Sequence, residues 1–337
     1  MLKALNFLLV GCGQIGQKHA ALMAQYGKIL AVCDTDGKKA TQFASQYQCD
    51  YFLDCNTMLQ VHPTADVVAI CTPNYLHASQ TILCLKNSIH VLCEKPMAIN
   101  TKDAIEMMQV ADQFNKKLFI VKQNRYNPPV AAVKNILENN LLGKICSIQL
   151  SCFWNRNNQY YNNSWKGKKE KDGGTLFTQF SHFIDLLYWY FGDIECIQAI
   201  IKNSNHQHII EFEDNGVISL SFVNGIIGTI NYSVNAFEKN MEGALTILGE
   251  KGTLKIGGQY LNELSYQHIQ NYAIPTLPQG NEPNNYGTYQ GSMSNHNAVY
   301  QHVIESLAAP SNNITNSFEA FKTVEIIERI YASALQK

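Results

Sequence analysis

The chain has 337 residues, of which 46% are hydrophobic and 16% are charged, with 26 basic and 27 acidic side chains. This composition is typical of a globular protein of about two domains and excludes a largely disordered chain. The nearly neutral net charge argues against a nucleic-acid partner, and no apolar run is long enough to span a membrane. We predict no signal peptide, and therefore a cytoplasmic protein whose cysteines are free thiols.

The first 122 residues alternate short apolar runs with segments of helical length. The runs do not alternate apolar with polar positions, which is typical of parallel strands covered on both faces. Right-handed crossovers between such strands predict a doubly wound Rossmann sheet in an α/β domain over residues 1–122. We expect strands at 6–10, 29–33, 51–53, 67–71, 90–93 and 118–121, and helices at 15–26, 75–87 and 101–115.

The pattern changes near residue 123, where longer runs with period-two alternation begin. These runs predict an α+β domain over residues 123–337, with a large open, mainly antiparallel sheet. Hairpin turns are predicted at Asn215-Gly216 and Asn224-Gly225, and residues 258–295 are expected to be irregular. We expect strands at 148–154, 194–201, 208–212, 217–223, 226–234, 245–248 and 253–256, and helices at 130–140, 176–191, 296–309 and 318–335.

A glycine-rich string, Gly11-Cys12-Gly13-Gln14-Ile15-Gly16, follows the first predicted strand and opens the first helix. In that context the string predicts a loop that brings a dinucleotide pyrophosphate to a helix N-terminus. Asp34 ends the second strand, where its carboxylate can bind the ribose 2′-hydroxyl and repel a 2′-phosphate, so NAD is favoured. NADP stays open, because Lys38 and Lys39 lie nearby in the sequence.

Two further loops follow strands of the first domain, at the edge where open α/β sheets bind ligands. One is Thr72-Pro73-Asn74 with His77, and the other is Glu94-Lys95-Pro96. A lysine at the end of a buried strand beside a dinucleotide is a candidate catalytic residue. We predict no metal, because no cysteine or histidine spacing typical of a zinc site occurs.

The second domain contains a candidate proton acceptor on a predicted helix. Asp172-Gly173-Gly174 precedes this helix, and Thr178, His182 and Asp185 are spaced to share one of its faces. A histidine beside a cleft can accept a proton near neutral pH. A purely structural role for His182 stays open as the alternative.

Basic and aromatic side chains are interleaved over residues 154–169, in a chain that has only three arginines, Arg125, Arg156 and Arg329. This mixture suits a ligand with an aromatic base and phosphates, although an ordinary basic loop is the alternative. The segment contains Trp154, Arg156, Tyr160, Tyr161, Trp165, Lys166, Lys168 and Lys169.

Four strings, GCGQIGQKH, TPNYLHA, CEKP and DGGTLFTQFSHFIDLLYWYFGD, occur together and in this order. With them the chain resembles the Gfo/Idh/MocA oxidoreductase family over its whole length. The resemblance implies hydride transfer between a nicotinamide and a sugar or polyol carbinol, and an open sheet that often forms a homodimer or homotetramer interface. The strings KQNRYNPP and WNR…YY…SWKG…DGG resemble the branch that acts at C3 of UDP-N-acetylated hexoses.

The resemblance also implies roles for single residues. Lys95 would contact the reacting hydroxyl and the nicotinamide ribose after a cis Lys95–Pro96 bond, and His182 would be the general base. Many members have Asp or Asn where this chain has Thr178, which cannot supply charge to His182. Cofactor contacts are expected at Gly11, Gly13, Gln14, Ile15, Gly16, Asp34, Thr72, Pro73, Asn74, His77, Glu94, Lys95 and Gln123. Substrate contacts are expected at Tyr126, Asn127, Arg156, Tyr160, Lys166, Thr178 and Gln179.

The expected reaction is NAD-dependent oxidation of UDP-N-acetylglucosamine to its 3-keto form. Three alternatives are left open: the uronate of that sugar nucleotide as substrate, a free sugar or inositol as substrate, and an NAD-binding regulator without turnover. The regulator is kept as an alternative because Thr178 stands where many family members have Asp or Asn.

Overall fold

A computed structural model describes residues 4–162, 164–287, 289–309 and 315–335. The chain divides into two compact units, the first made of residues 1–121 and 296–324 and the second of 122–295 and 325–337. The outermost residues of the two predicted domains, 1–3 and 336–337, lie outside the described ones.

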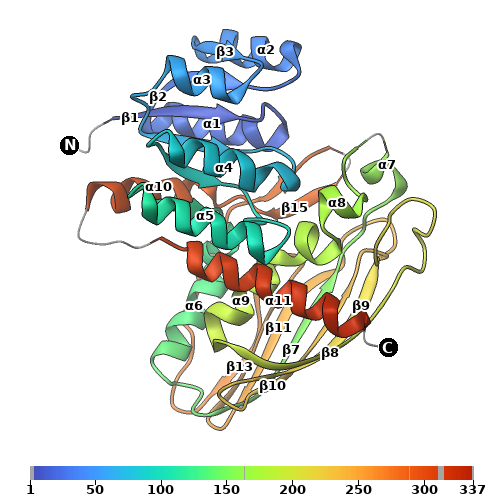
Figure 1. The fold of residues 1–337 in the computed structure, drawn as a ribbon. Helices are drawn as coiled ribbons and strands as arrows, with labels where there is room; N and C mark the ends of the chain where they lie inside the picture. Colours follow the sequence, from blue (N-terminus) through green and yellow to red (C-terminus); the bar gives the residue numbers. More distant parts are fainter. Residues whose placement is uncertain (1–3, 163, 288, 310–314, 336–337) are drawn as a thin grey trace. The chain divides into compact units, whose positions relative to one another are not determined.

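The first unit contains a six-stranded parallel sheet in the order β3-β2-β1-β4-β5-β6, which confirms the predicted Rossmann topology. Helices are packed around this sheet (Figure 1). Its strands are β1 (Leu5–Val10), β2 (Gly27–Cys33), β3 (Asp50–Phe52), β4 (Val67–Ile70), β5 (His90–Cys93) and β6 (Leu118–Ile120). Its helices are α1 (Gln14–Tyr26), α2 (Gly37–Tyr47), α3 (Cys55–Val61), η1 (Asn74–Leu76), α4 (His77–Lys86) and α5 (Thr101–Gln113).

Helix α10 (His296–Ala308) also belongs to the first unit, although the sequence analysis placed everything after residue 122 in the second domain. The reason is its apolar face, because Val299, Tyr300 and Val303 are buried in the same core cluster as Phe7 of β1. This core contains residues nearly 300 positions apart in the sequence. A division of the chain at one position, such as residue 122, therefore cannot describe the first unit.

The second unit contains a seven-stranded sheet in the order β13-β12-β11-β7-β10-β9-β8. Strands β7 and β10 pair in parallel, and the other neighbours pair antiparallel, so the sheet is mixed and mainly antiparallel as predicted. The strands are β7 (Ile145–Phe153), β8 (Ile194–Lys202), β9 (Asn215–Phe222), β10 (Ile227–Ser233), β11 (Glu242–Gly249), β12 (Gly252–Gly257) and β13 (Glu263–Ile269). The helices are η2 (Gln123–Tyr126), α6 (Pro128–Glu138), α7 (Asn158–Tyr161), α8 (Lys169–Asp172), η3 (Leu176–Phe180) and α9 (Ser181–Phe191).

Helix α11 (Ser317–Leu335) crosses the division between the units at residue 324. In the second unit its side chains bind the backbone of β8, because Arg329 donates to the carbonyls of Ile194 and Glu195, and Ser333 donates to that of Ile197. Among the described residues, no helix is long and apolar enough to cross a membrane.

Four expected elements of the second unit are corrected. Residues 208–212 form no strand, and Asn215-Gly216 lies inside β9 rather than in a turn, because Gly216 packs directly against the ring of Tyr232. Residues 258–295 contain the edge strand β13 and the small pair β14 (Pro283–Asn285) and β15 (Gln290–Met293). The helix predicted over 176–191 begins with a π-helical turn, η3, before α9.

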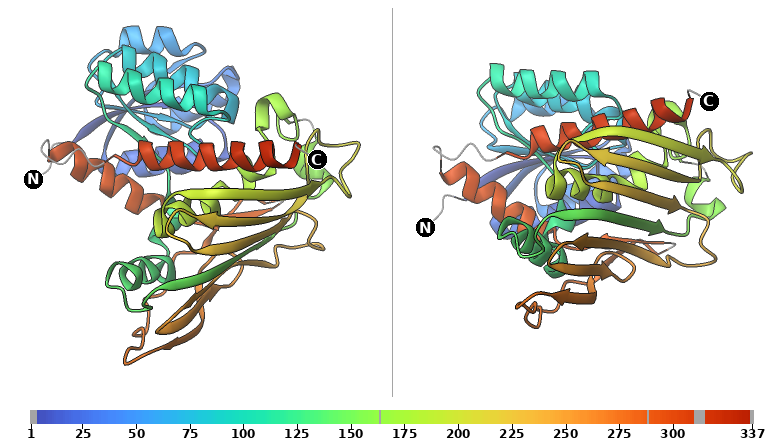
Figure 2. Two further views of the ribbon diagram at one scale, coloured as in Figure 1. Left: turned by 60° about the horizontal axis from the view of Figure 1, so that its bottom comes forward. Right: turned by 90° about the horizontal axis from the view of Figure 1, so that it is seen from below.

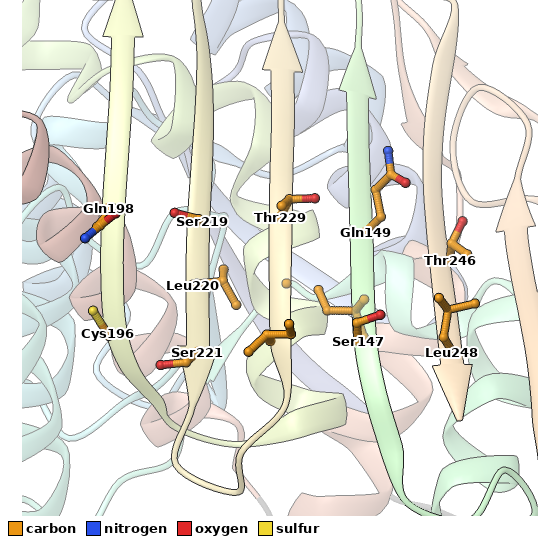
Figure 3. Close-up of a pocket in the computed structure, with 13 residues that line it drawn as sticks. Ser147, Gln149, Cys196, Gln198, Ser219, Leu220, Ser221, Thr229, Thr246 and Leu248 are labelled. Atoms are coloured by element: carbon orange, nitrogen blue, oxygen red, sulfur yellow. The ribbon is translucent and has the colours of Figure 1, made fainter. Parts of the chain in front are cut away.

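One face of the large sheet is not covered by any helix among the described residues of the second unit (Figure 2). Figure 3 shows small polar residues of β7, β8, β9, β10 and β11 side by side on this face. Apolar side chains lie among them with large exposed fractions, for example 63% for Ile200 and 60% for Ile227. Such a surface is uncommon on a monomer.

Candidate functional site

The glycine-rich loop of the first unit connects β1 to α1, as the sequence predicted. Gly11 has a φ of +99°, and a Cβ there would lie 2.6 Å from the carbonyl oxygen of Cys71. A Cβ at Gly16 would collide with the carbonyl of Gly11, so helix and loop approach more closely than a side chain allows. A Cβ at Gly13 would meet no atom within 4 Å, so the loop leaves space beside the helix N-terminus for the pyrophosphate of a dinucleotide.

Asp34 follows β2 and is fixed beside this loop. One carboxylate oxygen accepts the backbone N–H of Cys12 at 2.8 Å, and the other accepts that of Asp36 at 2.8 Å. The carboxylate is therefore oriented by the glycine-rich loop itself. This geometry suits recognition of a ribose hydroxyl.

His77 links the two other loops at the ends of the strands. Its ring lies 2.9 Å from the carbonyl oxygen of Thr72 through Nε2, and 2.7 Å from that of Pro96 through Nδ1. Burial lowers the pKa of His77, although both carbonyl contacts favour a proton on the ring. Because both ring nitrogens face backbone oxygens, His77 joins the loops to each other, and its expected contact to the cofactor stays a prediction.

Lys95 follows strand β5 and Glu94, and it is half-buried. The Lys95–Pro96 peptide bond is cis, as expected. The side chain of Thr72 donates to Gln80 at 2.6 Å, and Asn74 is buried, so the loop before η1 is held within the unit as well.

In the second unit, His182 lies in the first turn of α9 and is 4% exposed. Its Nε2 lies 3.1 Å from Nε2 of Gln123, a residue that the sequence analysis had placed at the cofactor. An amide nitrogen can only donate, so with this orientation Nε2 of His182 accepts, and its Nδ1 carries the hydrogen. His182 is then a neutral imidazole with its lone pair directed at the Gln123 amide.

A buried ion-pair cluster holds Gln123 against His182. Lys122 and Arg125, on either side of Gln123 and Asn124, both contact the carboxylate of Asp185 in α9, at 2.8 and 2.7 Å. Burial alone would raise the pKa of Asp185, but the two cations outweigh it and lower that pKa strongly. The basic residues of the KQNRYNPP string therefore attach η2 to the helix that carries His182.

Arg156 is the centre of an aromatic cluster. Its guanidinium carbon lies 5.0 Å from the ring centroid of Trp154, 5.2 Å from that of Tyr160 and 5.1 Å from that of Tyr289. Its Nε donates to Gln179 at 2.6 Å, and Gln179 donates to the hydroxyl of Tyr160 at 2.7 Å. Arg156 is 2% exposed, and within the described part of the chain it forms no ion pair with an acidic residue.

A cavity of about 570 Å³ lies beside this cluster on the surface of the second unit. It is lined by lysines and aromatic residues of the 154–169 segment and its neighbours. Lys166 extends over the ring of Tyr160, with Nζ 3.9 Å from the centroid. We call this cavity the lysine-lined cavity. Its lining includes Tyr161, Trp165, Lys166, Lys168, Lys171 and His208.

Thr178 lies in the π-helical turn, so it does not continue the α-helical face of His182 and Asp185 that the spacing predicted. Its hydroxyl contacts the carboxylate of Asp172. Asp172 is 1% exposed and also accepts the backbone N–H of Gly167 at 2.7 Å. A carboxylate is thus in direct contact with Thr178. It comes from position 172 and not from position 178, where many family members have Asp or Asn.

Two expected substrate residues are engaged inside the unit. Asn127 is 1% exposed; its amide donates to the carbonyl of Tyr260 and accepts from Asn295. The amide of Gln179 joins Arg156 to Tyr160, as described above. The expected substrate contacts of both residues stay predictions, as does that of Tyr126, which is 38% exposed.

Sequence reasoning missed Asn124 and Tyr289. Both polar atoms of the Asn124 side chain are buried without a hydrogen-bond partner among the described residues, and Asn124 follows Gln123 directly. Its place inside KQNRYNPP was the only signal. Tyr289 had no signal, because it comes from the segment expected to be irregular.

The loop, the Asp34 carboxylate and the parallel sheet together define an NAD-binding Rossmann unit. Residues 5–122 match a model described as "Oxidoreductase family, NAD-binding Rossmann fold", and residues 130–255 match the GFO/IDH/MocA C-terminal domain. The chain belongs to the GFO/IDH/MocA oxidoreductase family.

Solved structures similar to this chain include two bacterial WlbA dehydrogenases in complex with NADH and UDP-GlcNAcA. The protein of Chromobacterium violaceum is 32% identical, with 99% of this chain and 94% of that chain covered and a TM-score of 0.87. That of Bordetella pertussis is 31% identical, with 99% and 97% covered and a TM-score of 0.86. The 2,7-anhydro-N-acetylneuraminate hydratase of Escherichia coli is 28% identical over 261 residues, which are 76% of this chain and 68% of that protein.

Proposed function

We propose that this protein uses NAD to oxidise the C3 hydroxyl of a UDP-N-acetylated hexose to a ketone. The observation that carries the proposal is the lysine-lined cavity, next to the buried guanidinium of Arg156. Lysines suit a diphosphate, and aromatic rings suit a nucleobase or the apolar face of a sugar. The volume of the cavity is in the range of small-ligand sites.

Among such sugars, UDP-N-acetylglucosaminuronate is the first candidate and UDP-N-acetylglucosamine is the second. The sequence analysis ranked them in the opposite order, with the uronate as an alternative. The printed descriptions of the two WlbA structures name UDP-GlcNAcA as their bound sugar nucleotide, and these relatives cover nearly the whole chain. That likeness supports the uronate for this chain.

The proposed chemistry uses His182 and Lys95. Bound NAD supplies the acceptor for the hydride that leaves the sugar carbon. His182 takes the hydroxyl proton at Nε2, where the Gln123 amide now donates, and the Lys95 ammonium polarises the same oxygen. In this proposal Tyr126 and Lys166 contact the substrate. Arg156 and Gln179 hold Tyr160 beneath Lys166. Asn127, directly after Tyr126, is fixed by Tyr260 and Asn295.

The experiment is product detection. The purified protein is incubated with NAD and either sugar nucleotide, a hydroxylamine traps carbonyl groups, and mass spectrometry follows the sugar. Loss of two hydrogens with capture of a ketone, together with NADH formation, supports the proposal. A hydrated or dehydrated product without net NADH would indicate chemistry like that named for the hydratase relative. No product from either sugar, with NAD bound, would favour a free sugar or a regulator.

We further propose that the uncovered face of the large sheet joins copies of this chain into a homodimer or homotetramer. A cavity of about 530 Å³ on this face is lined by short polar and apolar side chains from β7 to β11 (Figure 3). Exposed Ile200, Val217, Ile227 and Leu248 lie on the same strands. Light scattering should give two or four times the chain mass of 37.9 kDa. A monomer at micromolar concentration would contradict this.

A further inference from the structure

The carboxylate of Glu94, directly before Lys95, is held from two helices that are distant in sequence. Oε1 of Glu94 lies 3.0 Å from Nε2 of His19 in α1 and 3.2 Å from Nε2 of His296 in α10. Oε2 accepts the backbone N–H of Lys95 at 3.1 Å. The carboxylate therefore connects both helices to the lysine that we place at the reacting hydroxyl.

Tyr300, one helical turn after His296, completes the arrangement. Its hydroxyl lies 2.8 Å from Nδ1 of His19. The His19 ring packs edge-to-face against the rings of His296 and Tyr300, each at 5.5 Å between centroids. None of His19, His296 and Tyr300 is more than 1% exposed. We call His19, Glu94, His296 and Tyr300 the Glu94 clamp.

The hydrogen positions in the clamp follow from its contacts. Burial alone would raise the pKa of Glu94, but hydrogen bonds from His19 and His296, together with electrostatic attraction to these two rings, outweigh it and place that pKa well below its ordinary value. Burial lowers the pKa of His296. Its Nδ1 has no hydrogen-bond partner among the described residues, so a proton there would be a buried donor without an acceptor. Nε2 of His296 faces Oε1 of Glu94, and so does Nε2 of His19, whose Nδ1 faces the Tyr300 hydroxyl.

We propose that His296 is a positioning residue for Lys95. His296 and His19 fix the carboxylate of Glu94, and the carboxylate fixes the backbone N–H of Lys95. His77 holds the next residue, because its Nδ1 lies 2.7 Å from the carbonyl oxygen of Pro96. The proposal rests on the proposed function, in which Lys95 polarises the sugar hydroxyl. It also gives a reason for the return of α10 to the first unit.

The same three ligand types also occur in metal sites. The ligand atoms of His19, Glu94 and His296 lie within 4.8 Å of one another, and two histidines with a glutamate are a zinc ligand set. The hydrogen-bonded arrangement is favoured, because Tyr300 and the Lys95 N–H complete it without an ion. Metal content is therefore one outcome of the test.

The experiment compares His296→Met, which removes the donor, with His296→Gln, whose amide can donate from a similar place. We expect His296→Met to lower kcat roughly 10- to 100-fold, since small misplacements of a catalytic group cost that much, with the KM for NAD within about threefold. His296→Gln should recover kcat to within about fivefold. His302→Met is the matched control on the same helix, where the ring packs on Phe119, and should keep kcat.

Tyr300→Phe is a second variant that removes a single oxygen, and it tests the clamp through His19 if His296→Met does not fold. Hydrogen exchange of the peptide around residues 93–97 gives a readout that needs no turnover, and it should be faster in His296→Met and in Tyr300→Phe. If the wild type oxidises neither sugar nucleotide, the proposed function fails, while this exchange still decides the clamp. Unchanged kcat and unchanged exchange in both variants would overturn the clamp. One zinc ion per wild-type chain, lost in His296→Met, would replace it with a metal site.

Discussion

Glu94 in the first unit and Glu213 in the second are glutamates of similar burial, 6% and 4% exposed, whose carboxyl groups are held differently. Both oxygens of Glu94 accept N–H groups, from two imidazoles and one backbone amide. Within the described part of the chain, only Oε1 of Glu213 has partners, the hydroxyls of Tyr331 at 2.8 Å and Tyr232 at 3.2 Å. Oε2 of Glu213 is buried without a hydrogen-bond partner among the described residues.

The pKa values of the two carboxyl groups follow this difference. Burial raises the pKa of Glu213 to about 7, and the nearby Asp172 adds to the rise, whereas the pKa of Glu94 is well below its ordinary value. Burial by itself therefore does not decide the charge of a buried acid, because the number and type of donors can reverse its effect. Glu94 stays charged beside Lys95, and Glu213 changes charge near neutral pH.

Glu213 also bears on the segment that leads to His182. The hydroxyl of Tyr331, which contacts Glu213, also accepts the backbone N–H of Leu176 at 3.2 Å. A Cβ at Gly174 would collide with that hydroxyl, so the turn before η3 is packed directly on Tyr331. Each glutamate thus supports a segment next to one proposed catalytic residue.

The largest loss of activity is expected when the proposed catalytic residues, Lys95 and His182, are replaced. Lys95→Met removes the ammonium group, and His182→Gln keeps a polar partner for Gln123 but removes the proton acceptor. We expect each variant to lower kcat for sugar oxidation by about 10²- to 10⁴-fold, the usual range for a general acid or base. Steady-state kinetics measures this, and circular dichroism should be unchanged.

Lys144→Met and His268→Gln are matched controls for these variants, because both side chains are exposed and neither belongs to the residues assigned to binding or catalysis. They should turn over like the wild type. If Lys95→Met and His182→Gln also did so, the catalytic assignment would be wrong.

The difference between Glu213 and Glu94 also predicts how the free energy of unfolding depends on pH. The pKa of Glu213 is about 7 in the folded state, against an ordinary value of 4.5. The folded state then binds this proton more tightly than the unfolded chain does. The resulting stabilisation is complete below pH 4.5 and is lost as pH rises through 7. The difference corresponds to about 3 kcal/mol of unfolding free energy.

Urea unfolding at pH 5 and pH 8 tests this for the wild type and for Glu213→Gln, which keeps an acceptor for both tyrosines. The wild type should be less stable at pH 8 by an amount that Glu213→Gln removes. Glu94→Gln is the matched control: the pKa of Glu94 lies below this pH window, so the wild-type dependence on pH should persist. The same pH dependence in the wild type and Glu213→Gln would contradict the assignment.

The sequence predicted the parts of the site that depend on local order. The glycine-rich loop, Asp34 and Lys95 all lie at strand ends, so the pattern of strands and helices was enough to place them. The cis Lys95–Pro96 bond was expected only from the resemblance to the family. The antiparallel sheet was predicted as well, but its edge strand β13 was missed, because most of its residues are polar or exposed. Its partner β12 supplies the pairing that its own composition does not indicate.

The contacts that give these residues their roles were not predictable in the same way. Asn127 contacts Asn295, which is 168 positions away, and Glu94 contacts His296, which is 202 positions away. The residues next to Asn127 or Glu94 in the sequence do not indicate which distant residue each one contacts. A buried polar side chain needs some partner, but the fold decides whether that partner is a ligand or another residue of the chain.

Arg156 is the cationic counterpart of Glu94, since it too is buried in its unit but is surrounded by rings and amides instead of an opposite charge. Arg156→Lys keeps the charge and loses the planar fork, which leaves Gln179 without its donor and loosens Tyr160 under Lys166. The KM for the UDP-sugar should therefore rise about tenfold, as expected for one lost hydrogen bond to a charged group, while the KM for NAD stays within about twofold. Arg329→Lys, whose guanidinium binds backbone carbonyls of β8, is the control and should change neither KM. Equal increases in both KM values for Arg156→Lys would mean that Arg156 supports the fold in general and not the binding of the sugar nucleotide.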